Sequence, residues 1–142
     1  MPYGFSSEKA KRQLDRALLG TLDSGEEIKL WSLVDSLSNP VAIGLSRLGT
    51  PMGSPLVFWR AHAIALSQWR FFMTKPTSGI AFVGSLDWFA PISALEVVSF
   101  HSGPMWADLR LKVYDRPTMR LNSNWHFKKS LAAINAAIPN RP

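Results

Sequence analysis

The sequence predicts a mainly β (α+β) domain with one helix near each end of the chain. Several short segments alternate apolar and polar residues, most clearly Ala107–Asp115 (ADLRLKVYD), and this alternation is typical of half-buried antiparallel strands. Glycine and proline separate these segments, as expected for turns. The closing segment instead spaces its apolar residues with helical periodicity. With 142 residues, 46% of them hydrophobic, the chain is long enough for one domain with its own core.

The first segment, SSEKAKRQLDRALLG, predicts a short amphipathic helix. Ser6 or Ser7 can cap its start, and Gly20 suits its C-terminal end. The apolar stripe of this helix is thin and lacks aromatic anchors, which favours packing on its own domain over insertion into a membrane surface. We therefore assign residues 1–21 to this helix and 22–142 to the β-rich remainder of a single domain.

The following segments predict about seven strands. The pattern in HAIALSQWRFFMT indicates two strands joined at Ser67–Gln68, with small alanines on one face that allow a neighbouring element, such as a second sheet, to pack closely. Pro91 restricts its own segment to a sheet edge or a bulge. A brief helix is predicted at 40–48, inside the less regular segment 38–55. The strands are expected at 28–34, 60–66, 69–74, 80–83 with an irregular continuation, 96–100, 109–113 and 119–121.

The last element is predicted to be a helix at about 124–138. Ser123 or Asn124 can cap it, and Pro139 ends it. Its apolar residues share one face of the helix and are expected to pack into the domain. They are Phe127, Leu131, Ile134 and Ile138.

Four of these segments, taken in order, resemble bacterial pleckstrin-homology-like (PH-like) domain proteins. They are HAIALSQWRFFMT, APISALEVVSFHSG, ADLRLKVYD with TMRL, and FKKSLAAINAAI, and the resemblance covers roughly residues 56–138. The sequence departs from the family pattern at Arg116–Pro117, where the family usually has a glycine, so a different turn is expected there.

The resemblance implies a partly open barrel of two near-orthogonal antiparallel sheets, capped by the C-terminal helix. The helix would close one end of the barrel, and alternate residues of the last two strands would line its interior. The family carries no shared catalytic or ligand residues to transfer to this chain, and its fold is used to bind lipids, peptides and proteins. The interior residues implied are Leu109, Leu111, Val113, Met119 and Leu121.

No catalytic, metal or cofactor site is predicted. The chain has no cysteine, its three histidines fall on unrelated elements, and neither a nucleotide-binding glycine motif nor a serine nucleophile motif is present. His62 is expected to be a structural residue on a strand face. Glu26 and Glu27 are adjacent, so they cannot work as a pair on one strand face, and both are expected to be solvated turn residues. From these absences we expect a protein that is not an enzyme and binds no cofactor.

Basic residues give the main functional lead. The formal net charge is +6, and residues 107–142 hold seven Lys and Arg against two Asp. Arg110 and Lys112 should share the outer face of one strand, Arg120 should lie beside them on the next, and Arg116 should sit at the turn between them. These four residues are the candidate site for an anion, lipid or partner. The alternative is a solvated outer face in which Asp108 and Asp115 are the ionic partners.

The function expected from these observations is binding rather than catalysis. A protein partner or a homo-oligomer is the first expectation, and peripheral binding of anionic membrane lipids through the basic residues is the second. Nucleic acid is a third use of the same charge, disfavoured because the predicted strand offers few exposed aromatics. The first residues lack the apolar core of a secretion signal, and no run approaches the roughly 20 apolar residues of a membrane span. A cytoplasmic protein, with peripheral membrane contact in the second case, is expected.

Overall fold

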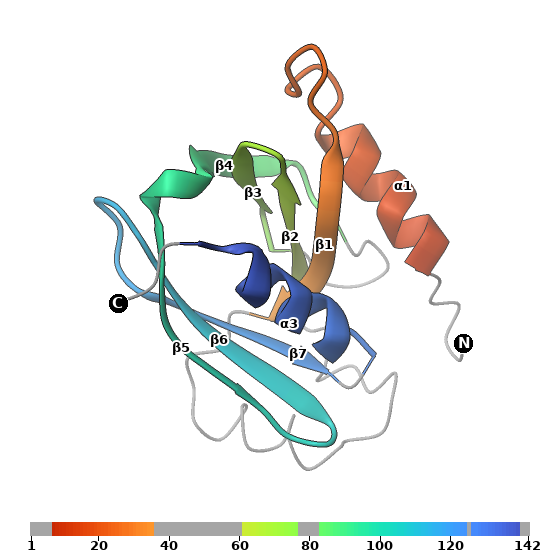
Figure 1. Cartoon of the computed structure of the whole chain (residues 1–142). Helices are drawn as coiled ribbons and strands as arrows, with labels where there is room; N and C mark the ends of the chain where they lie inside the picture. The colour runs from red at the N-terminus through yellow and green to blue at the C-terminus, as the bar shows by residue number, and fades with distance from the viewer. Residues whose placement is uncertain (1–6, 36–60, 77–82, 125, 140–142) are drawn as a thin grey trace.

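The computed structural model describes residues 7–35, 61–76, 83–124 and 126–139, and the account below concerns these residues. They form the predicted mainly β fold with a helix near each end (Figure 1). The first helix, α1 (Ser7–Ala17), precedes seven strands, and α3 (Lys128–Ala137) follows them. The strands are β1 (Ile28–Asp35), β2 (Ala61–Ser67), β3 (Arg70–Thr74), β4 (Leu86–Pro91), β5 (Leu95–Ser102), β6 (Trp106–Val113) and β7 (Met119–Asn124).

The strands follow the antiparallel order β4-β3-β2-β1-β7-β6-β5. In the described residues β1 and β7 share one register pair, Asp35 with Asn122, so the order divides into halves of four and three strands. Figure 1 shows the strands of the two halves running in different directions, with α3 across the space between them. No described pairing joins β4 to β5, and the barrel is therefore partly open, as predicted.

Alternating strand residues build a core on each face of the first half. On the inner face, Val34, Ile64 and Phe71 pack with buried residues of β5, β6 and β7 and with the apolar side of α3. Helix α1 packs on the opposite, outer face of this half. The predicted interior residues Leu109, Leu111, Val113 and Leu121 are buried in this inner core, and Met119 packs against it, partly buried.

The small alanines of β2 face helix α1 rather than a second sheet. Ala63 and Ala65 are fully buried in the outer cluster with Ala10, Leu14 and Leu18 of α1. A side chain no larger than a methyl group lets a helix approach a sheet closely. The prediction that these alanines permit close packing is confirmed, and the suggestion that the neighbour is another sheet is wrong.

Two predicted boundaries and one predicted packing position are corrected. The reversal between β2 and β3 lies at Gln68–Trp69, one residue later than expected, because Ser67 still belongs to β2. Neither Ser123 nor Asn124 caps the last helix: both lie in β7, and α3 begins at Lys128 without a side-chain cap. Phe127 belongs to the outer cluster, where its ring lies 5.6 Å from that of Trp31, and not to the inner one.

The strand expected at 80–83 falls mostly outside the described residues, and its last residue, Val83, is buried but lies in no strand. The edge position expected for Pro91 is confirmed, because it ends the edge strand β4. The brief helix expected at 40–48 and the remainder of 38–55 lie outside the described residues.

Candidate binding surface

The four predicted basic residues lie on the hairpin formed by β6 and β7. Arg110 and Lys112 are on β6, Arg120 is on β7, and Arg116 is in the connecting turn. Arg110 and Arg120 are direct cross-strand partners. The structure therefore brings the predicted residues onto one hairpin, but their side chains have different surroundings.

The charge of Arg120 is neutralised by Asp108. The Arg120 Nε donates to both carboxylate oxygens of Asp108, at 3.1 and 3.2 Å, and one of its terminal nitrogens lies 3.1 Å from Oδ2. The Asp108 side chain is 4% exposed and that of Arg120 is 31% exposed. Paired donors on one carboxylate give a well-oriented contact. Asp108 is thus an ionic partner as the alternative interpretation expected, yet it is buried rather than solvated.

Arg116 and Lys112 are engaged at the turn between β6 and β7. The guanidinium carbon of Arg116 lies 4.3 Å from the centre of the Trp88 ring, within the range of a cation–π contact. Trp88 belongs to β4, so this contact joins the hairpin to the opposite end of the strand order. The Lys112 Nζ donates to the backbone carbonyl oxygen of Arg116.

Arg110 differs from the other three. It is exposed, and within the described ranges no carboxylate lies at ion-pair distance from it. Its cross-strand neighbour Arg120 carries the same charge, which is satisfied by Asp108. Asp108 neutralises Arg120 alone, so an anion beside Arg110 would give that residue its first counter-ion among the described side chains. Arg110 is the cation of the predicted set that is most available to a ligand.

The turn between β6 and β7 is built around Asp115. Asp115 adopts a positive φ of 67°, the left-handed conformation that glycine usually supplies, and aspartate tolerates it better than most residues. The backbone nitrogen of Arg116 donates to the carbonyl of Val113 at 2.9 Å and closes the turn. Asp115, one residue before Arg116–Pro117, therefore supplies the left-handed backbone conformation that this turn requires.

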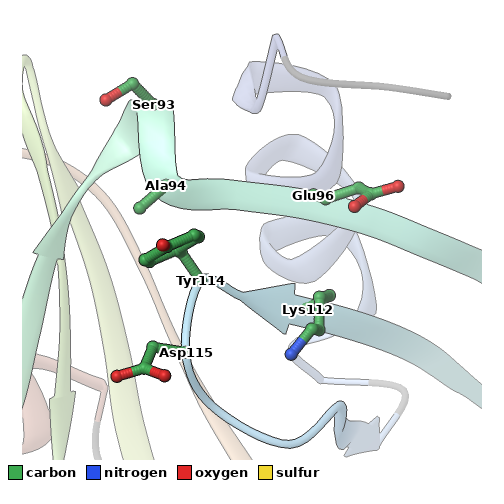
Figure 2. Close-up of a pocket in the computed structure, with 6 residues that line it drawn as sticks. All are labelled: Ser93, Ala94, Glu96, Lys112, Tyr114 and Asp115. Atoms are coloured by element: carbon green, nitrogen blue, oxygen red, sulfur yellow. The ribbon is translucent and has the colours of Figure 1, made fainter.

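An open cleft of about 560 Å³ lies where β5 begins (Figure 2). Figure 2 shows Glu96 projecting from β5, while the Lys112 side chain extends from β6 toward the turn. Glu96 and Lys112 are cross-strand partners. With two carboxylates and one amine the cleft carries both signs of charge, which suits a polar peptide better than a bare anion. Its lining residues are Ser93, Ala94, Glu96, Lys112, Tyr114 and Asp115.

Strand β5 forms one end of the strand order. It pairs with β6, and no other described strand pairs with it. A register irregularity between Val97 and Ser99 leaves Val98 as an extra residue, and Val98 is 50% exposed. Pairing is regular from Ser99 to Ser102. The stretch 97–102 contains no Lys, Asp, Glu or Pro, the residues that commonly prevent an edge strand from pairing.

A buried ion pair near the start of the β-rich region was not predicted. The Glu26 side chain has no exposed surface, and its carboxylate accepts from the Arg70 Nε at 3.0 Å and from a terminal nitrogen of Arg70. The hydroxyl of Ser67 also donates to Glu26, at 2.5 Å, and so does the backbone nitrogen of Asp23, at 2.9 Å. The expectation that Glu26 is a solvated turn residue is wrong, whereas Glu27 is exposed as expected and pairs with Lys29.

The same arginine lies against two aromatic rings. The Arg70 guanidinium carbon lies 5.0 Å from the ring centre of Phe72 and 4.7 Å from that of Phe89. One of its terminal nitrogens also donates to the carbonyl of Thr21 at 2.9 Å. These contacts of the guanidinium tie the segment after α1 to the β2–β3 hairpin. One feature of the sequence could have indicated the Glu26–Arg70 pair: Arg70 begins a largely apolar strand, and a buried arginine needs a counter-ion.

Stability is expected to fall in acid because of Glu26. Hydrogen bonds from Arg70, followed by those from Ser67 and Asp23, outweigh the effect of burial and lower the pKa of Glu26 from 4.5 to about 2. Because the folded-state pKa is below the unfolded one, the stabilisation is present above about pH 4.5 and is lost as the pH falls toward 2. Urea unfolding measured from roughly pH 6 down to roughly pH 2 should show the decline. A Glu26→Gln variant should show a flatter profile, and equal profiles would contradict this assignment.

His62 is buried on the inner side of β2, as expected for a structural residue. Across the described ranges no three His, Asp or Glu side chains form a group that could hold a metal ion. Among the helices of the described residues, none is long and apolar enough to cross a membrane.

Comparison with protein-family models, curated proteins and solved structures finds no match for this chain.

Proposed function

We propose that this chain is a non-enzymatic binding module of the bacterial PH-like type, and that it engages a protein partner at β5 and the adjoining face of β6. The observation that carries the proposal is the eight-residue edge strand β5, unpaired on its outer side by any described strand. An edge of this kind presents unpaired backbone groups to which another chain can add. The neighbouring exposed Arg110 supplies charge for recognition. The PH-like assignment rests on the order of the sequence motifs and on the agreement of the strand and helix order with it.

Peripheral binding to an anionic membrane is the second candidate. Arg110, Lys112 and Arg116 lie at one hairpin, and each cation near an anionic surface contributes about 1 kcal/mol. Against it, Arg116 is held on Trp88, Arg120 is neutralised, and Glu96 and Asp115 stand beside Lys112. The arrangement offers isolated cations among carboxylates rather than a continuous basic surface, and it therefore favours a protein.

Site-specific photo-cross-linking tests the proposal. A benzophenone amino acid replaces Val98 on the β5 edge or, as a control, Arg12 on the exposed side of α1. Irradiation of cells that naturally contain the protein should give a discrete protein adduct from position 98 and none of the same mass from position 12. Equal adducts from both positions, or none from position 98, would overturn the proposal.

The membrane candidate has its own test. Vesicles of anionic phospholipid should sediment the protein at about 0.1 M salt if the basic residues bind headgroups, since screening then acts beyond about 10 Å. We expect little co-sedimentation, and no difference between the natural chain and an Arg110→Glu, Lys112→Glu variant. Strong binding that this variant abolishes would favour the membrane over the protein partner.

A further inference from the structure

The geometry points to an acidic extended segment as the partner of β5: we infer that such a segment adds to the Ser99–Ser102 edge as a further strand and places a carboxylate beside Arg110. This inference rests on the proposed function and specifies the chemistry of the partner. It depends on the edge of β5 with which no described strand pairs, on the position of Arg110 one strand inside that edge, and on the surrounding charges.

The edge is suited to strand addition over a defined length. Ser99 to Ser102 pair in unbroken register with Arg110 to Ala107 of β6, so the backbone of this part of β5 is regular. The irregularity at Val97–Ser99 ends that stretch on one side. Edge strands are often protected by lysine, proline or inward-pointing charge, and 97–102 has none of these. A partner therefore meets a short, uncharged edge.

Arg110 supplies the selectivity for charge. Arg110 on β6 pairs directly with Ser99 on β5. Only the small side chain of Ser99 would therefore lie between Arg110 and a strand added beyond β5. The added strand would lie two inter-strand spacings from β6, about 9.6 Å, and the extended side chains of Arg110 and a glutamate can meet over the small Ser99 between them. On its other side Arg110 meets Arg120, whose charge is taken up by Asp108. A carboxylate from the added strand would thus give Arg110 a counter-ion, as Asp108 does for Arg120.

A second copy of the chain fits this edge less well than an acidic segment does. Antiparallel pairing of two β5 strands around Ser99 would bring the Arg110 residues of both copies toward the same axis. Each copy also carries a net charge of +6, which opposes association. Charge complementarity therefore selects an acidic partner over self-association.

Matched peptides test the inference directly. The probe is a capped, fluorescent peptide of about nine alternating Thr and Val residues with a central Glu, long enough to cover β5, and its counterpart has a central Lys. Anisotropy titrations at low salt should show the Glu peptide binding at least about fivefold more tightly, the ratio for an exposed ion pair of about 1 kcal/mol. The Arg110→Glu variant should invert this preference. Arg16→Glu, on the exposed face of α1, makes the same change in net charge and should preserve it.

Amide hydrogen exchange locates the bound peptide. Saturating Glu peptide should slow exchange within Ser99–Ser102, and an unchanged unfolding midpoint should show that Arg110→Glu still folds. Absence of peptide binding, a preference that Arg110→Glu leaves intact, protection elsewhere, or self-association through β5 would each overturn the inference. If neither peptide binds while position 98 still cross-links a protein, strand addition is rejected and the proposed function is retained. If the peptides do not bind and position 98 gives no adduct, both the inference and the proposed function are rejected.

Discussion

Glu26→Ala is expected to destabilise the fold by about 3–5 kcal/mol, because it leaves the Arg70 guanidinium without its buried counterion. The Arg70 side chain is 15% exposed and lies against two aromatic rings, so water cannot replace the carboxylate fully. The change also removes the acceptor used by Ser67 and by the backbone nitrogen of Asp23. Urea unfolding near neutral pH, followed by tryptophan fluorescence, measures the difference.

Glu27→Ala is the matched control for Glu26→Ala. It removes the same functional group one residue away, but this carboxylate is exposed and contacts only Lys29 and solvent among the described contacts of its side chain. We expect no measurable change in its unfolding midpoint. If the two variants unfold alike, Glu26 is not the buried partner of Arg70 in solution, and the link between the segment after α1 and the β2–β3 hairpin is absent.

Leu131→Ala is expected to cost about 2–5 kcal/mol, the range for truncating a fully buried leucine. Leu131 has no exposed surface and lies in the inner core with Ile134 and Ile138, where α3 spans the two halves of the strand order. The cavity left behind weakens the contact that holds the halves together.

Leu19→Ala provides the comparison for Leu131→Ala, because Leu19 is 83% exposed just after α1. We expect its unfolding midpoint to match that of the natural chain. A Leu131→Ala variant as stable as Leu19→Ala would show that α3 does not pack into the barrel, and it would contradict the fold described above.

The strands could be predicted because their faces differ in polarity. The alternation of Leu109, Leu111 and Val113 with polar residues identified β6, and the same pattern gave β1 and the β2–β3 hairpin. The helix boundary at 124 could not be predicted correctly, because Ser123 and Asn124 suit a helix cap as well as a strand end. Which face of β2 receives α1 also depends on packing between distant segments.

The candidate site was predictable in position but not in electrostatics. Strand alternation placed Arg110, Lys112 and Arg120 on one hairpin, and the structure agrees. Alternation alone cannot show that Arg120 is neutralised by a buried Asp108, or that Arg116 reaches Trp88 on the far strand. These contacts depend on burial and on tertiary distance, as does the pairing of Glu26 with Arg70 across 44 positions.

Arg110 links the strand edge to the charge that selects its partner, and one measurement tests this link most directly. It is the yield of the cross-linked adduct from position 98 in cells, compared between chains that also carry Arg110→Glu or Arg16→Glu. Both changes alter the net charge equally, and both residues are exposed. A protein partner at β5 predicts that Arg110→Glu removes the adduct while Arg16→Glu retains it. Retention of the adduct in both variants, or its loss in both, would contradict the account.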